Sequence, residues 1–125
     1  MKTFEIRKQF AFSASHILTG LPEGHPCGRM HGHNYIVEIV LAADDLNEVG
    51  FVRDYGELKV FKEFIDNEID HRHLNDVIPG QPSAELIAKF LYEFARARWP
   101  EVVAVRVSET PKTWATYSPS LNRTD

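Results

Sequence analysis

Three histidines, His16, His31 and His33, are spaced so that two neighbouring strands could direct them to one point. Side chains two residues apart on a strand point to the same face, so His31 and His33 leave their segment in the same direction. Three neutral imidazoles form a ligand set that zinc uses in catalytic sites, where one coordination position stays free for substrate. The spacing therefore predicts a zinc site with an open position, and an enzyme.

Each of these histidines also has an ordinary structural interpretation. A single histidine near a strand end is more often a partly buried polar tip than a metal ligand. An H-x-H pair changes that balance, because two imidazoles that face one place without a cation leave polar groups unsatisfied. The pair His31 and His33, taken together with His16, favours a metal site.

The single cysteine, Cys27, stands shortly before the histidine pair and has three interpretations. A thiol near Arg29 and a metal ion would be a candidate base or nucleophile, because positive charge favours the thiolate. As a fourth metal ligand, the thiol would instead close the site and make it structural. The third interpretation is a small buried side chain that only fills space.

Two further positions carry groups suited to proton transfer or recognition. Asp70 and His71 are adjacent at the end of a predicted helix, and an imidazole beside a carboxylate can be oriented by it. Histidine is also common at helix ends because it interacts favourably with the helix dipole. Glu109 follows a valine-rich strand, and its spacing alone is equally compatible with a solvated carboxylate.

Composition limits the class of protein. A chain of 125 residues with 43% hydrophobic residues suits one domain over residues 1–125. The 14 basic and 18 acidic residues give a net charge of -4 without a Lys/Arg run, which argues against nucleic-acid binding. One cysteine excludes an internal disulfide, and no segment reads as a signal core or a membrane span. We expect a cytoplasmic protein without a membrane partner.

Alternating apolar residues predict two long strands at the start of the chain. Even-numbered positions from Phe4 to His16 form one apolar face, which Lys8 interrupts, and the odd-numbered positions of residues 31–41 form another. Antiparallel pairing of these strands, with residues 18–30 as the connection, would place His16 beside His31.

Two helices are predicted in the middle of the chain. Asp54 is expected to cap the first helix, with Glu57 completing a capping box, and the helix is expected to end within residues 70–73. Ser83 is expected to cap a second helix that ends before Pro100. The buried side of this second helix is expected to carry Leu86, Ile87, Phe90, Leu91 and Phe94.

Two strands complete the chain, at residues 103–107 and, after a turn at Pro111, residues 114–118. The order ββααββ predicts an α+β fold with a four-stranded antiparallel sheet and both helices on one face. Sheet edges are usually blunted or paired with another chain, and residues 103–107 are apolar enough to suggest such pairing. We therefore expect a homo-oligomer.

The order and spacing of several motifs together resemble one known superfamily, the 6-pyruvoyl-tetrahydropterin and 6-carboxytetrahydropterin synthases, which has the tunnelling fold. The resemblance covers nearly the whole chain. Its motifs are Ser15-His16, Pro22-Glu23-Gly24-His25, Cys27-Gly28-Arg29-Met30-His31-Gly32-His33-Asn34-Tyr35, Val52-Arg53-Asp54-Tyr55 with Glu57-Leu58-Lys59, Asp70-His71 with Leu74-Asn75, Pro82-Ser83-Ala84-Glu85 and Ser108-Glu109-Thr110.

The resemblance implies a metal and a base. His16, His31 and His33 match the zinc ligands of the superfamily, and Cys27 matches the general base that removes a proton from the substrate side chain. Zinc is expected to lower the pKa of the hydroxyl groups on that side chain.

The resemblance also implies which residues assist proton transfer and which hold the pterin. Asp70 and His71 match the pair that assists the cysteine in proton transfer. Glu109 matches the carboxylate that grips the 2-amino-pyrimidinone edge, whose two adjacent N–H donors suit two carboxylate oxygens, and it is also placed in the proton relay. Ser83 stands at a substrate-binding position where Thr is frequent, and retains a hydroxyl.

Two reactions on one substrate, 7,8-dihydroneopterin triphosphate, are implied. One eliminates triphosphate and leaves a pyruvoyl side chain. The other breaks a carbon-carbon bond, releases acetaldehyde and leaves a 6-carboxy group, for 7-deazaguanine and queuosine biosynthesis. The short spacing from Cys27 to His31 resembles the bacterial carboxy type, whereas Asn34-Tyr35 is common to both types.

The resemblance further implies rings, typically hexamers, whose subunits join edge to edge with active sites at the boundaries. Two other classes stay open. A pterin- or purine-binding module would have lost Cys27 or a zinc histidine, and none is lost here. A structural zinc protein would use Cys27 as a ligand, so that Cys27→Ala would weaken zinc retention.

Overall fold

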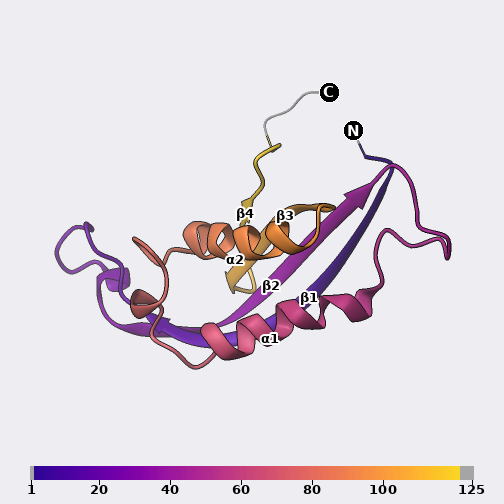
Figure 1. Ribbon diagram of the computed structural model, residues 1–125. Helices are drawn as coiled ribbons and strands as arrows, with labels where there is room; N and C mark the ends of the chain where they lie inside the picture. Colours follow the sequence, from indigo (N-terminus) through magenta and orange to yellow (C-terminus); the bar gives the residue numbers. More distant parts are fainter. Residues whose placement is uncertain (1, 122–125) are drawn as a thin grey trace.

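The sheet of this protein is built from a long hairpin at the start of the chain and a short hairpin at its end, as the computed structural model of residues 2–121 shows (Figure 1). The strands pair antiparallel in the order β1-β2-β3-β4. This confirms the predicted ββααββ order. The elements are β1 Phe4–His16, β2 His31–Ala43, α1 Lys59–Glu68, α2 Ala84–Arg98, β3 Val102–Thr110 and β4 Thr113–Tyr117.

The register of the long hairpin follows the predicted alternation. Strands β1 and β2 have 13 residues each and pair from Phe4 opposite Ala43 to His16 opposite His31. Because side chains alternate between the two faces, the even positions of β1 and the odd positions of β2 share one face. The histidines therefore end the same face that carries the core.

Both helices cover that face. Phe10 of β1 meets Phe61 of α1 edge to face at 5.4 Å, and Phe12 stacks on Tyr35 of β2 at 4.6 Å. A single apolar cluster joins the strands to both helices; its fully buried members include Val37, Ile39, Leu41, Phe61, Ile65, Ile87, Leu91, Val105 and Val107. Among residues 2–121, no helix has both the length and the apolar character needed to cross a bilayer.

The starts of the two helices differ in how well they match their predicted caps. Ser83 caps α2 as predicted, since its side chain accepts a hydrogen bond from the Leu86 backbone. Asp54 does cap a helical segment, but that segment is a 3₁₀ turn, Tyr55–Leu58, and α1 begins only at Lys59. The predicted capping box is wrong, because Glu57 pairs with the Arg53 guanidinium at 2.9 Å instead.

Two expectations about exposure are also wrong. Leu86 is 36% exposed, because α2 turns the side of Ile87, Ala88 and Leu91 toward the sheet. Residues 103–107 do not form an edge strand, because β3 lies between β2 and β4. The sheet edges are β1 and β4.

The face of the sheet opposite the helices carries one nearly buried carboxylate. Glu38 accepts hydrogen bonds from Arg106 at 2.7 Å and Gln9 at 3.0 Å, and Arg7 lies 3.5 Å away. Burial acts to raise the pKa of Glu38, but the two hydrogen bonds and the two arginine charges outweigh it and lower the pKa below its ordinary value.

We expect Glu38→Gln to destabilise the protein by about 1 to 3 kcal/mol at pH 7, because it removes a charge that two arginines and Gln9 surround. A carboxyl group with a lowered folded-state pKa stabilises the fold above its unfolded pKa of about 4, and that contribution is lost as the pH falls through the folded pKa. The variant should therefore lose less stability than the wild type between pH 5 and pH 2, by urea unfolding. An equal loss of unfolding free energy in the two proteins between pH 5 and pH 2 would contradict this role of Glu38.

Candidate metal centre

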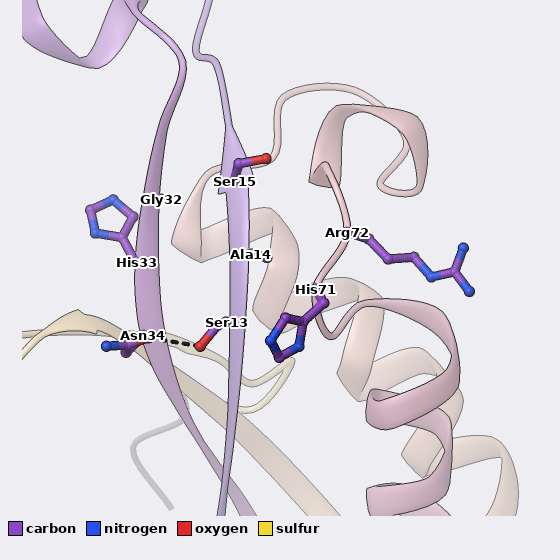
Figure 2. Close-up of a pocket in the computed structure, with 8 residues that line it drawn as sticks. All are labelled: Ser13, Ala14, Ser15, Gly32, His33, Asn34, His71 and Arg72. Carbon is purple, nitrogen blue, oxygen red and sulfur yellow. Dashed lines mark hydrogen bonds between the residues drawn. The ribbon is translucent and has the colours of Figure 1, made fainter.

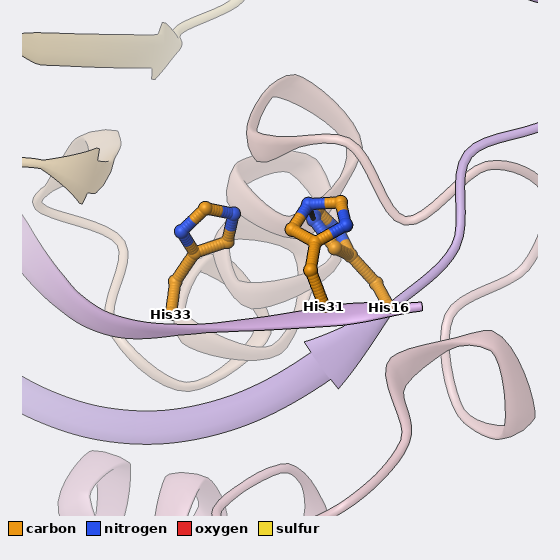
Figure 3. A group of neighbouring side chains, drawn as sticks. All are labelled: His16, His31 and His33. Carbon is orange, nitrogen blue, oxygen red and sulfur yellow. Dashed lines mark hydrogen bonds between the residues drawn. The ribbon is translucent and has the colours of Figure 1, made fainter. Parts of the chain in front are cut away.

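The three histidines meet at the end of the long hairpin where residues 17–30 connect its two strands (Figure 3). His16 is the last residue of β1, and it lies opposite His31, the first residue of β2. His33 follows two positions later on the same face. One nitrogen of each ring lies within 4.8 Å of those of the other two, so the predicted convergence is confirmed.

Backbone carbonyls set the tautomers of two of the rings. His16 Nδ1 lies 2.7 Å from the carbonyl oxygen of Pro82, and His31 Nδ1 lies 2.6 Å from that of Arg29. A carbonyl oxygen only accepts, so both Nδ1 atoms carry the hydrogen and, in neutral rings, both Nε2 atoms present lone pairs. These Nε2 atoms are 2.9 Å apart. Two facing lone pairs at this distance are stabilised by a cation that both can bind.

The third ring adds a nitrogen without a partner. His33 Nε2 is buried and makes no hydrogen bond, although Glu109 Oε2 lies 3.0 Å away. Burial lowers the pKa of His33, Glu109 opposes that shift, and the nearby His16 and His31 add to it. The neutral imidazole is the form that binds a metal ion. The three nitrogen donors thus fit a divalent metal ion.

Glu109 lies beside the three histidines rather than in solvent. Its Oε2 is 3.0 Å from His33 Nε2 and 3.8 Å from His16 Nε2, and its side chain is 24% exposed. The solvated interpretation is therefore wrong. Strand β3 places this residue beside β2, next to the histidines.

Cys27 lies in the connection between β1 and β2, in a short 3₁₀ turn, Pro26–Gly28. Its thiol is free and of intermediate exposure. Within the part of the chain that the structure describes, the group of convergent ligand atoms consists of the three histidines and contains no sulfur. This arrangement gives no support to Cys27 as a fourth ligand.

Asp70 and His71 form the expected pair, but they lie along the outer edge of β1. His71 Nδ1 donates to Asp70 Oδ2 at 2.9 Å, and Asp70 Oδ1 accepts from the Ser13 backbone at 2.9 Å. These two hydrogen bonds, the one from Ser13 first, lower the pKa of Asp70. His71 has φ 58°, a left-handed conformation that is uncommon for residues other than glycine, although histidine adopts it more often than most, and that recurs at functional sites.

Figure 2 shows where this pair stands relative to the histidines. The His71 ring lies beyond β1, whereas the His33 ring extends from the far side of β2, so both strands separate them. The His71 side chain is 80% exposed. It borders a hollow of about 400 Å³ that Ser13, Asn34 and also His33 line. Within the part of the chain that the structure describes, His71 is thus not a member of the convergent histidine group.

We expect the purified protein to carry about one divalent metal ion per chain, and His33→Ala to lose it, because the ion would keep only two ligands. At a free metal concentration of about 1000 times Kd, the wild type should gain about 4 kcal/mol of stability, a rise in Tm of about 10 °C or more. Elemental analysis and thermal unfolding measure both. His73→Ala is the matched control, because His73 bonds Ser15 outside the trio. Equal metal content in the His33→Ala and His73→Ala proteins would contradict the assignment of His33 as a metal ligand.

Comparison with known proteins identifies relatives of this chain. The family model for 6-pyruvoyl tetrahydropterin synthase matches residues 5–120. The 6-carboxy-5,6,7,8-tetrahydropterin synthase of Bacillus subtilis is 32% identical, covering 94% of this chain and 86% of the relative. The enzyme of the same name from Synechocystis is 35% identical, covering 94% and 95%.

Solved structures agree with this result. The structure of Caenorhabditis elegans 6-pyruvoyl tetrahydropterin synthase matches with a TM-score of 0.82 and 25% identity, over 94% of this chain and 96% of that one. The tunnelling fold implied by the sequence motifs is thereby confirmed. The chain belongs to the 6-pyruvoyl tetrahydropterin synthase family, and it is similar to the bacterial 6-carboxy-5,6,7,8-tetrahydropterin synthases within it.

Proposed function

We propose that this chain is a zinc-dependent lyase that converts 7,8-dihydroneopterin triphosphate to 6-carboxy-5,6,7,8-tetrahydropterin, with release of acetaldehyde and triphosphate. The product would serve 7-deazaguanine and queuosine biosynthesis. The observation that carries the proposal is the similarity to 6-carboxy-5,6,7,8-tetrahydropterin synthases across 94% of the chain. The convergent histidines support it, because they offer the open metal site that such a lyase requires.

His16, His31 and His33 would hold the zinc ion. When bound, zinc supplies a Lewis acid that lowers the pKa of hydroxyl groups on the substrate side chain. The carbonyls of Pro82 and Arg29 keep two of the rings in the tautomer that leaves Nε2 free.

Glu109 would bind the pterin ring. Its carboxylate can accept two hydrogen bonds from the adjacent N–H groups of the 2-amino-pyrimidinone edge. Because Glu109 Oε2 lies within 3.0 Å of His33 Nε2 and 3.8 Å of His16 Nε2, a pterin held there has its ring beside the metal ligands. Ser83 is a second proposed pterin contact, although its hydroxyl already caps α2.

Cys27, Asp70 and His71 would move protons. Cys27 would take a proton from the substrate side chain as general base. Asp70 holds the hydrogen of His71 on Nδ1, which leaves Nε2 as the basic atom of an exposed ring. A lowered pKa keeps Asp70 ionised and able to hold that orientation.

We further propose a homo-oligomer, a hexamer by family resemblance, with sites at subunit boundaries. In the described part of the chain, the β4 edge and the part of the β1 edge before Ser13 are free to pair and support this, as does the exposed position of His71 away from the three histidines of its own chain. A second subunit that packs against the β1 edge of the first would then have the His71 of the first subunit at its own site. A thiol base also requires a reducing compartment, so we propose a cytoplasmic location.

A second candidate is the pyruvoyl reaction on the same substrate. It is favoured by the match to the Caenorhabditis elegans synthase. Mass spectrometry of the products from 7,8-dihydroneopterin triphosphate decides between them. Acetaldehyde with 6-carboxytetrahydropterin is the expected result, and a pyruvoyl pterin would replace our proposal with the alternative.

A further inference from the structure

Two side-chain amides bind the backbone just after the metal ligand His16. Asn75 Oδ1 accepts from the Ile17 N–H at 2.8 Å, and Asn75 Nδ2 donates to the Ile17 carbonyl at 2.9 Å. Gln81 Oε1 accepts from the Thr19 N–H at 3.1 Å, and its Nε2 donates to the Thr19 carbonyl. Each amide thus makes the pair of hydrogen bonds that a neighbouring strand would make.

Leu18, which lies between Ile17 and Thr19, faces away from the two amides. In an extended segment, backbone groups of alternate residues face opposite sides, so holding Ile17 and Thr19 from one side presents Leu18 on the other. The Leu18 N–H donates to the carbonyl of Cys27 at 3.1 Å. The N–H of Cys27 in turn donates to His25 Nδ1 at 3.1 Å. Both backbone polar groups of Cys27 are therefore held.

These contacts matter because most other hydrogen bonds of the Cys27 loop, such as those of the Gly28 and Arg29 N–H groups, stay within the loop, whereas the Leu18 N–H ties Cys27 to the segment after β1. Between β1 and β2 the chain forms one 3₁₀ turn of 3 residues, which has no buried residue. A loop with few buried contacts keeps its thiol in one place only through such hydrogen bonds. A displacement of about 1 Å at a reacting group can cost about 100-fold in rate.

We propose that Asn75 and Gln81 are positioning residues that hold residues 17–19 and, through Leu18, hold the Cys27 backbone and so fix the position of the Cys27 thiol. The segment that carries them also supplies Asp70, His71 and the Pro82 carbonyl that orients His16. One stretch of chain, residues 70–82, then aligns both the thiol and a metal ligand. The catalytic part of this inference rests on the proposed role of Cys27.

The chain has a single cysteine, so its alkylation by iodoacetamide reports on Cys27 alone. In the double variant Asn75→Leu/Gln81→Met, we expect alkylation to be about 5-fold faster or more, since the half-buried thiol becomes more accessible. We expect kcat to fall about 10-fold or more with a smaller change in KM, and metal content to stay at the wild-type value. The single variants should show the same two changes, smaller in size, and they carry the test where the double variant does not fold.

Asn47→Leu is the matched control. Asn47 also holds a loop with its side chain, accepting from the Val49 and Phe51 backbones at 3.0 Å each, but this loop follows the opposite end of β2. It should leave alkylation and kcat unchanged. An alkylation rate in the folded double variant equal to that of the wild type would overturn the proposal. Full activity of Cys27→Ala would instead refute the proposed role of Cys27, while the alkylation result would still decide whether the two amides hold the loop.

Discussion

Replacing Cys27 by alanine should lower kcat by about 100- to 10,000-fold while the protein keeps its full metal content. A general base contributes about this factor to a rate, and the histidine ligands do not involve the thiol. Substrate binding should change little, since Glu109 and the metal centre are intact. Steady-state kinetics with 7,8-dihydroneopterin triphosphate and elemental analysis of the same sample measure both effects.

Cys27→Ser is the matched control for this substitution, because it keeps the size of the side chain but replaces the thiol by a much weaker acid. It should lie close to Cys27→Ala in kcat and match the wild type in metal content. A loss of metal in both variants would make Cys27 a ligand and the site structural. Wild-type turnover in Cys27→Ala would remove the thiol from the reaction.

Sequence periodicity was sufficient to predict the part of the site that lies on strands. Strand side chains repeat every two residues, so the parity of His16, His31 and His33 could only place them on one face once the hairpin formed. Both apolar faces had to meet the same core, and the register that forms places His16 opposite His31. The Ser83 cap was predictable for a similar reason, because N-cap preference is a local property.

The groups that complete the site left no such signal. The carbonyls of Arg29 and Pro82 orient two histidines, but every residue has a carbonyl, so no residue type marks the position. The position of β3 inside the sheet depends on long-range pairing with β4 and not on the valines themselves. The placement of His71 beyond β1 likewise follows from tertiary hydrogen bonds to Ser13.

The position of His71 leads to the second large effect, which concerns the assembled protein. Residues 71 and 72 already occupy the β1 edge near the metal centre, since His71 N–H bonds the Ser13 carbonyl and Ser15 N–H bonds that of Arg72. A neighbouring subunit can therefore not extend the sheet there, but it can meet the exposed His71 ring. If His71 serves the site of that neighbour, Cys27 and His71 of one working site come from different chains.

Mixed oligomers of two inactive variants should then recover activity. Co-expressed Cys27→Ala and His71→Ala subunits, mixed at random in equal amounts, place an intact Cys27 and an intact His71 together in about one quarter of the sites. We expect about a quarter of wild-type turnover from the mixture, against almost none from either variant alone. Cys27→Ala co-expressed with the Cys27→Ala/His71→Ala double variant is the control and should stay inactive, because no subunit supplies the thiol. A mixed oligomer without activity would place both residues in the site of one chain, and then His71 would have to reach its own metal centre by a rearrangement of residues 70–73.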